Sequence, residues 1–135
     1  MSRFTSHLGL RLREDGRGRP IMRDDRCTWE VMDPALVYEV GAEGSGGVVV
    51  VPAGTVTDLA SIPWPVRAFL PPDGPWAKAA VLHDHLYATK GEGRFGRKQA
   101  DGVLREAMEV LGVPAWKRAI IYNAVRLGGG GSWGG

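Results

Sequence analysis

Two short polar clusters stand among apolar, Gly and Pro residues, and a further carboxylate follows them along the chain. The clusters read Thr-Asp-Leu-Ala-Ser-Ile-Pro over 57–63 and His-Asp-His-Leu-Tyr over 83–87, and the later carboxylate is Asp101. Carboxylates and imidazoles are costly to bury unless they pair with another group, bind a metal or take part in catalysis. The stretch from 57 to 101 is therefore where the sequence predicts a functional site.

The residues around His83 predict a helix over about 76–88. At helical spacing His83 and Tyr87 share its apolar face, where the Tyr87 hydroxyl can join a polar network. His85 lies about 200° around the helix from His83, so the two histidines cannot bind one ion from it. An inward histidine on its own is more often a hydrogen-bonded core residue than a catalyst. Its interpretation therefore depends on the carboxylates near it.

Two carboxylates outside this helix favour a site at His83. Asp101 opens the next expected helix, over about 97–111, and antiparallel packing of the two helices would bring it to His83. Asp58 follows the strongest predicted strand, at the point where a rigid element meets a loop. An imidazole held by one carboxylate, with another nearby, can act as a general base or as a metal ligand.

These residues predict two kinds of chemistry, and the sequence leaves both open. In the first, His83 is a general base that Asp101 orients, and Tyr87 completes the catalytic set. In the second, Asp58, His83 and Asp84 bind a divalent metal, zinc or calcium, that activates water. The spacing matches no His-Glu-x-x-His zinc motif and offers no pair of cysteines.

The elements that must position these residues predict an α+β fold. Apolar and β-branched runs up to about residue 60, above all the valines of 48–51, predict a small antiparallel sheet with a hairpin loop over 41–47. Helices follow over about 76–88, 97–111 and 114–127. We expect 1–127 to form a single domain and 128–135 to be a Gly-rich C-terminal tail.

Apolar residues at helical spacing predict the inward face of each helix. On the first helix these residues are Trp76, Ala79, Ala80, His83, Leu86 and Tyr87. On the second they are Ala100, Val103, Leu104, Ala107, Met108 and Leu111. On the third they are Trp116, Ala119, Ile120, Ala124 and Leu127. Burying these faces is expected to join the helices to one another and to the sheet.

Composition and charge narrow the possible functions. The 135 residues carry a net charge of +2 with no run of Lys and Arg interleaved with aromatic residues, so we expect no nucleic-acid partner. Cys27 is the only cysteine, which excludes an internal disulfide and a multi-Cys zinc site. The polar start of the chain predicts no signal peptide, and no stretch approaches the roughly 20 apolar residues of a transmembrane helix. We therefore expect synthesis in the host cytoplasm.

The span from Val51 to Leu127 resembles a family of small uncharacterised proteins encoded by tailed phages and prophages. The segments that carry the resemblance are Val-Pro-Ala-Gly over 51–54, Thr-Asp-Leu-Ala-Ser-Ile-Pro over 57–63, Ala-Ala-Val-Leu-His-Asp-His-Leu-Tyr over 79–87, Lys-Gln-Ala-Asp over 98–101 and Leu-Gly-Val-Pro-Ala-Trp-Lys-Arg over 111–118. The resemblance covers more than half of the chain. It implies a phage context without an agreed activity.

A second and looser resemblance is to the secreted phospholipases A2. In that family a helical His-Asp-x-x-Tyr motif supplies the general base and a calcium-binding carboxylate, and an Asp on the antiparallel partner helix orients the histidine. His83, Asp84, Tyr87 and Asp101 follow the same order. The chain departs from that family in having no disulfides and no clear counterpart of its calcium-binding loop.

These observations lead to two expectations of different classes. The first is a phage virion-associated protein of the tail or tail tip, with a His/Asp hydrolase-like site that acts on the bacterial cell envelope. Its partners are then other phage tail proteins and an envelope substrate, and its location is the virion. The second is a non-enzymatic structural or assembly protein of the tail, in which the His/Asp network only stabilises packing.

Overall fold

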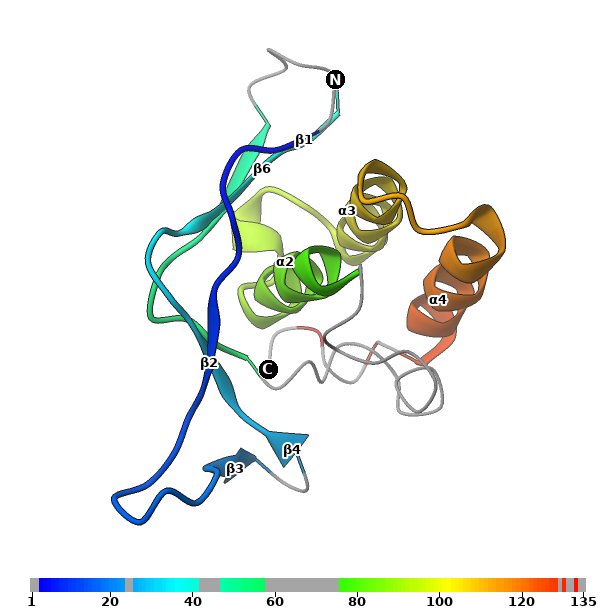
Figure 1. The fold of residues 1–135 in the computed structure, drawn as a ribbon. Helices are drawn as coiled ribbons and strands as arrows, with labels where there is room; N and C mark the ends of the chain where they lie inside the picture. Colours follow the sequence, from blue (N-terminus) through cyan, green and yellow to red (C-terminus); the bar gives the residue numbers. More distant parts are fainter. Residues whose placement is uncertain are drawn as a thin grey trace.

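The computed structural model describes residues 3–23, 26–41, 47–57 and 76–128, together with Gly130 and Trp133. Within these residues, strands occupy the chain up to Thr57 and long helices begin at Ala77 (Figure 1). The predicted α+β fold, with an N-terminal antiparallel sheet region and a C-terminal helical region, is therefore confirmed.

The described strands form two three-stranded antiparallel sheets and a two-stranded one, where the sequence predicted a single small sheet. The first sheet has the order β1 (Arg3–Phe4), β6 (Leu36–Glu39), β7 (Val48–Val51). The second has the order β2 (Leu10–Leu12), β5 (Trp29–Val31), β8 (Val56–Thr57). The remaining pair is β3 (Met22–Arg23) with β4 (Arg26–Cys27).

Strands β6 and β7 form the predicted hairpin. Leu36 pairs with Val51 at one end of the ladder and Glu39 with Val48 at the other. Along β7 the side chains alternate, so that Val49 and Val51 are buried while Val48 and Val50 face outward. A strand rich in β-branched residues thus covers the core with one face only.

Three α-helices follow within the described residues, namely α2 (Ala77–Ala88), α3 (Arg97–Val110) and α4 (Ala115–Gly128). A short 3-10 turn, η1 (Gly91–Gly93), connects α2 to α3. Figure 1 shows α2 nearest the strands, α3 next to it and α4 on the far side of α3. Helix α2 packs against both three-stranded sheets, through β6, β7 and β8. No described helix is long and apolar enough to cross a membrane.

The core lies between the sheets, α2 and α3. The predicted inward face of α2 is buried, and so are Val81, Leu82 and His85, because the sheets cover one side of this helix and α3 another. On α3 the predicted stripe is confirmed from Ala100 to Met108, while Leu111 packs against it from just beyond the helix.

The predicted inward face of α4 is wrong except at Ala124, which packs partly buried against the core. Trp116, Ile120 and Leu127 are exposed to 60%, 42% and 90%, whereas Ile121 and Val125 are fully buried. Helix α4 carries apolar residues on two opposite sides, and the side with Ile121 and Val125 packs against α3. Helical spacing alone does not determine which of two apolar sides finds a partner.

Candidate active site

His83 and Asp101 form a buried pair between α2 and α3. The imidazole Nε2 lies 2.7 Å from Asp101 Oδ1, and neither side chain has exposed surface. Asp101 is brought to His83 because the two helices pack together across the short connection between them. The predicted meeting of these two residues is therefore present in the structure.

Asp101 is hydrogen-bonded from two further directions. The Tyr87 hydroxyl donates to Oδ1 at 2.6 Å, and Arg126 Nη1 of α4 donates to Oδ2 at 2.7 Å. The rings of His83 and Tyr87 also contact each other, with centroids 4.3 Å apart. One carboxylate thus connects α2, α3 and α4, and Tyr87 lies where the sequence analysis placed it.

Arg97 extends this network to the end of α4. Its Nε donates to the Tyr87 hydroxyl at 3.1 Å, and its Nη2 donates to the carbonyl oxygens of Val125 and Arg126 at 2.7 and 3.0 Å. Carbonyl groups at a helix C-terminus lack partners within the helix and carry partial negative charge. A guanidinium at this position therefore stabilises the last turn of α4 while it also holds Tyr87.

The protonation states in the network follow from these contacts. Burial acts to raise the pKa of Asp101, but the hydrogen bonds from His83, Tyr87 and Arg126 outweigh it and lower that pKa, so the carboxylate stays ionised. Burial first, and then the neighbouring Asp101, raises the pKa of Tyr87, which remains a hydrogen-bond donor. Because the ionised Asp101 can only accept, the hydrogen atom between the two side chains lies on His83 Nε2.

Asp84 lies on another side of α2, at the sheet. The Thr57 hydroxyl of β8 donates a hydrogen bond to Asp84 Oδ2. Asp58, the residue after Thr57, lies outside the described residues. Of the predicted metal ligands that the structure describes, His83 binds Asp101 and Asp84 accepts from Thr57, and no group of three or more His, Cys, Asp or Glu within the described part of the chain could hold a metal ion.

Trp133 covers the outer side of Tyr87. The two rings meet edge to face with centroids 5.1 Å apart, and Trp133 packs partly buried against the core. Its ring also approaches Gly91, where an added Cβ would lie 3.4 Å from Trp133 Cη2 and 3.0 Å from Phe95 Cβ. Contact between a residue of the Gly-rich tail and the predicted site was not predicted from the sequence.

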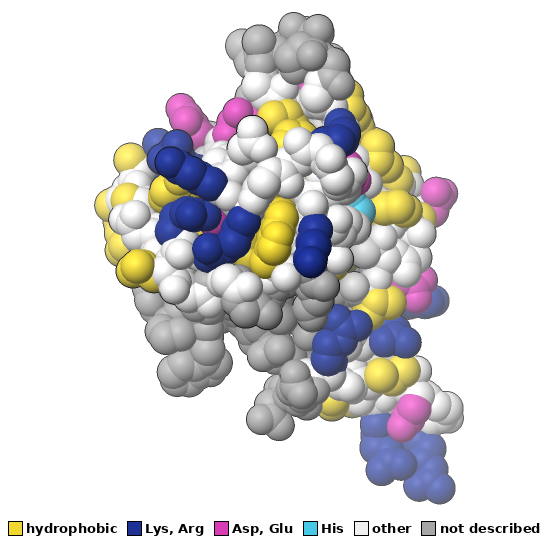
Figure 2. Space-filling view, turned by 180° about the vertical axis from the view of Figure 1, so that it is seen from behind, with side chains coloured by type: hydrophobic (Ala, Val, Ile, Leu, Met, Phe, Trp, Pro, Cys, Tyr) yellow, Lys and Arg dark blue, Asp and Glu magenta, His cyan; other side chains and the backbone are white. Residues whose placement is uncertain are grey.

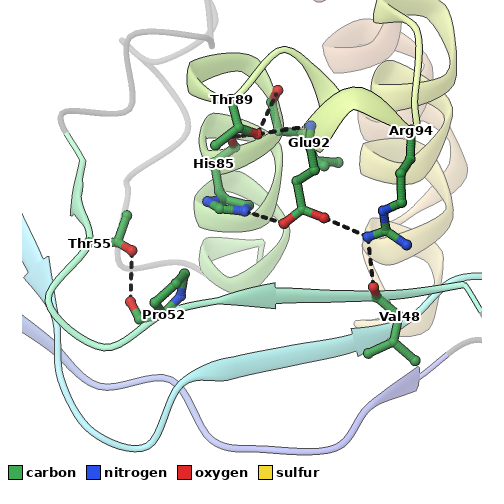
Figure 3. A network of polar contacts seen from close by, with 8 residues as sticks. Val48, Pro52, Thr55, His85, Thr89, Glu92 and Arg94 are labelled. Carbon is green, nitrogen blue, oxygen red and sulfur yellow. Dashed lines mark hydrogen bonds and ion pairs between the residues drawn. The ribbon is translucent and has the colours of Figure 1, made fainter.

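A second histidine–carboxylate pair lies on the opposite side of α2, facing β7 (Figure 3). His85 Nε2 is 2.7 Å from Glu92 Oε2, and Arg94 Nη2 donates to Glu92 Oε1 at 2.5 Å. Arg94 also donates to the Val48 carbonyl oxygen at 2.8 Å. This cluster holds the turn between α2 and α3 against the edge of the sheet.

Sequence reasoning did not assign roles to Arg97, Arg126 or Glu92. Arg97 is half-buried at the junction of α3 and α4, where it donates to the Val125 carbonyl oxygen. Arg126 had one usable signal, its position as a basic residue in the last helical turn. Glu92 had none beyond its place in a Gly-rich loop.

Comparison with known proteins gives a family but no activity. Residues 29–125 match the family described as "Protein of unknown function (DUF1353)". No curated protein and no solved structure matches the chain. The matched residues include His83, Asp84, Tyr87 and Asp101. Because the match spans more than half of its length, the protein belongs to the DUF1353 family.

Proposed function

We propose that this protein is a phage virion-associated hydrolase that acts on the bacterial cell envelope and uses His83 as its general base. The observation that carries the proposal is the pair of His83 Nε2 and Asp101 Oδ1 at 2.7 Å, with the Tyr87 hydroxyl on the same carboxylate oxygen. A carboxylate that holds one imidazole nitrogen orients the ring and stabilises the imidazolium formed when the other nitrogen takes a proton.

In this mechanism Nδ1 of His83 removes a proton from water, and the resulting hydroxide attacks the carbonyl carbon of an ester. The bond from that carbon to the alcohol oxygen then breaks, and the alcohol leaves with the proton that His83 returns. Asp101 stays ionised throughout, because Tyr87 and Arg126 hydrogen-bond its two oxygens. Since His83 has no exposed surface, water and substrate reach it only when the side chains around it move.

The residues present fit calcium better than zinc. Asp84 and Thr57 offer oxygen atoms close together, whereas His83 already uses Nε2 to bind Asp101. A calcium ion held by Asp84, with Asp58 as a further ligand, would supply positive charge for the oxygen of the reacting carbonyl group. Elemental mass spectrometry after dialysis against calcium is expected to find about one ion per chain, lost in Asp84→Asn.

The proposed phage context comes from the sequence resemblance described above, and the order of His83, Asp84, Tyr87 and Asp101 supports phospholipid esters as the first substrates to test. The assay measures fatty acid released from phospholipid vesicles, and soluble fragments released from peptidoglycan. The variants are His83→Gln and the matched control His85→Gln, which changes the other histidine of α2.

We expect His83→Gln to lower kcat by about 10²- to 10⁴-fold, because it removes the general base. His85→Gln should keep most of the activity, and both variants should keep the near-UV circular dichroism of the folded protein. Turnover by the wild type that His83→Gln leaves unchanged, or no turnover of either substrate by the wild type, contradicts the proposal.

A second candidate function is structural, as a non-enzymatic protein of the phage tail. The observation that favours it is complete burial, since His83 and Asp101 have no exposed surface while Asp101 connects three helices. Buried polar networks can serve to specify packing alone. This candidate predicts that His83→Gln changes the unfolding midpoint and that no substrate is turned over.

A further inference from the structure

The outer face of α4 carries large apolar side chains that no described element covers. Trp116, Ile120 and Leu127 are 60%, 42% and 90% exposed. At about 100° per residue they fall within a stripe of roughly 40° on the helix, and at about 1.5 Å per residue the stripe is roughly 16 Å long. Scattered exposed apolar residues are ordinary, but aligned ones form a surface that can bind another apolar phase.

The chain around this stripe is positively charged. From Val110 to Gly135 the sequence contains Lys117, Arg118 and Arg126 and no Asp or Glu, and of these three cations Arg126 forms an ion pair with Asp101. The Lys117 ammonium lies 5.4 Å from the centroid of the Trp116 ring, so a cation directly borders the stripe. Figure 2 shows Lys and Arg side chains gathered over the side of the molecule that holds α3 and α4, with hydrophobic side chains beside them.

The apolar stripe and the cations beside it together indicate which kind of partner fits this surface. A second copy of α4 would bring the same cations together without an acidic residue of α4 to neutralise them. A nucleic acid would satisfy the cations but leave Ile120 and Leu127 without an apolar partner. A bilayer that contains anionic phospholipid satisfies both, because apolar side chains enter the acyl boundary while Lys and Arg remain among the headgroups.

We propose that α4 docks this protein on an anionic phospholipid surface through Trp116, Ile120 and Leu127, with Lys117 at the headgroups. The inference deepens the proposed function, because it places the candidate active site at the surface of a phospholipid membrane. Arg126 of the same helix donates to Asp101, so the docking helix is also the one that holds the candidate active site. Docking itself requires no catalysis and is measured without it.

The test is co-sedimentation of the full chain with vesicles of phosphatidylcholine alone, or of phosphatidylcholine mixed with phosphatidylglycerol. We expect binding to the mixed vesicles, weakened by added salt, and little binding to the neutral ones. Leu127→Ala and Trp116→Ala should each reduce partitioning by roughly 10-fold or more, because each removes a side chain that the membrane buries. Lys117→Glu should reduce binding to the mixed vesicles and leave binding to neutral vesicles unchanged.

Met22→Ala is the matched control. Met22 is 50% exposed on β3, far from α4 in the fold, so its truncation removes similar apolar surface and should not change vesicle binding. The proposal is overturned if neither vesicle binds, if both bind equally, or if the Met22 variant loses as much binding as the Leu127 variant. It is also overturned if Leu127→Ala dissolves a dimer, or abolishes binding to an oligonucleotide, without changing vesicle binding.

The two proposals fail separately in these experiments. Vesicle binding that persists in a protein without hydrolytic activity supports the docking surface and contradicts the proposed hydrolase. Hydrolysis of soluble short-chain esters that depends on His83, without vesicle binding, supports the hydrolase and contradicts the docking surface.

Discussion

The two histidine–carboxylate pairs of α2 have the same nitrogen–oxygen distance but differ in how far their side chains are buried. The ring nitrogen lies 2.7 Å from the carboxylate oxygen both in the pair of His83 with Asp101 and in the pair of His85 with Glu92. In the first pair neither side chain is exposed, whereas in the second the side chains are 9% and 24% exposed. A donor–acceptor distance alone therefore does not distinguish a candidate active site from a local contact.

The difference lies in what each carboxylate connects. Asp101 is hydrogen-bonded to residues of α2 and α4 that lie 14 to 25 positions away, so it joins three consecutive helices. Glu92 is bonded to His85 and Arg94, which lie within seven residues of it. The first pair is part of the core, while the second fastens a turn to the sheet edge. Breaking each pair should consequently have effects of different size.

Asp101→Asn should have the largest effect. Its buried carboxylate accepts from His83, Tyr87 and the partly exposed Arg126, and a hydrogen bond to a charged group contributes about 1.5–3 kcal/mol. We expect a loss of that order in the free energy of unfolding by urea. A loss below about 1 kcal/mol would show that the network contributes little to stability, as for an exposed ion pair.

The free energy of unfolding should fall at low pH, because Asp101 is then protonated. Its pKa is lowered in the folded protein, so its contribution to stability is present above its unfolded pKa of about 3.9 and is lost as the pH falls through the folded value. We expect the wild-type free energy of unfolding to decline below about pH 4 and to decline less steeply in Asp101→Asn. Measurement is by urea titration at stepped pH. An identical slope in both proteins contradicts the lowered pKa.

The sequence was sufficient for the His83–Asp101 pair because every step toward it is short-range. Apolar spacing identified the side of α2 that carries His83 and the buried stripe of α3 beside Asp101, and a short connection favoured packing of the two helices as neighbours. Once those faces met, Asp101 lay within reach of His83. The division of strands into separate sheets was not predicted, because pairing between distant strands depends on contacts that a local pattern does not encode.

The sequence did not predict features that depend on packing between elements. Helix α4 has two apolar sides, and only packing against α3 determines that Ile121 is buried and Ile120 exposed. Arg97 and Arg126 became site residues because the end of α4 reaches the start of α3. The single-domain assignment of 1–127 and the metal site that includes Asp58 remain predictions.

Glu92→Gln should have a smaller effect than Asp101→Asn. Its carboxylate hydrogen-bonds to His85 and Arg94, but it is partly exposed. Water can therefore replace some of the hydrogen bonds that the substitution weakens. Burial acts to raise the pKa of Glu92, and the hydrogen bonds from His85 and Arg94 lower it overall. We expect a loss of about 1–2 kcal/mol in urea unfolding, as for a hydrogen bond to a charged group. A loss equal to that of Asp101→Asn would remove the distinction between the two pairs.

The smallest change in the free energy of unfolding is expected at Lys90, where the substitution should stabilise the protein. The turn from Lys90 to Gly93 has positive φ throughout, with Lys90 at 51° and Glu92 at 56°. A side chain disfavours this left-handed conformation by about 1–2 kcal/mol, and glycine does not carry that cost.

The Lys90 side chain is exposed and its backbone N–H, which donates to the Tyr87 carbonyl oxygen, would be retained. Lys90→Gly should therefore stabilise the protein by about 0.5–1 kcal/mol, since part of the gain is lost to the greater freedom of unfolded glycine. Lys90→Ala is the matched control and should bring no such gain, because alanine keeps the Cβ atom.

Glu92→Gly relieves the same strain but removes the bonds to His85 and Arg94, so it should destabilise. If Glu92→Gly instead stabilises as much as Lys90→Gly, the His85–Glu92 pair does not hold the turn.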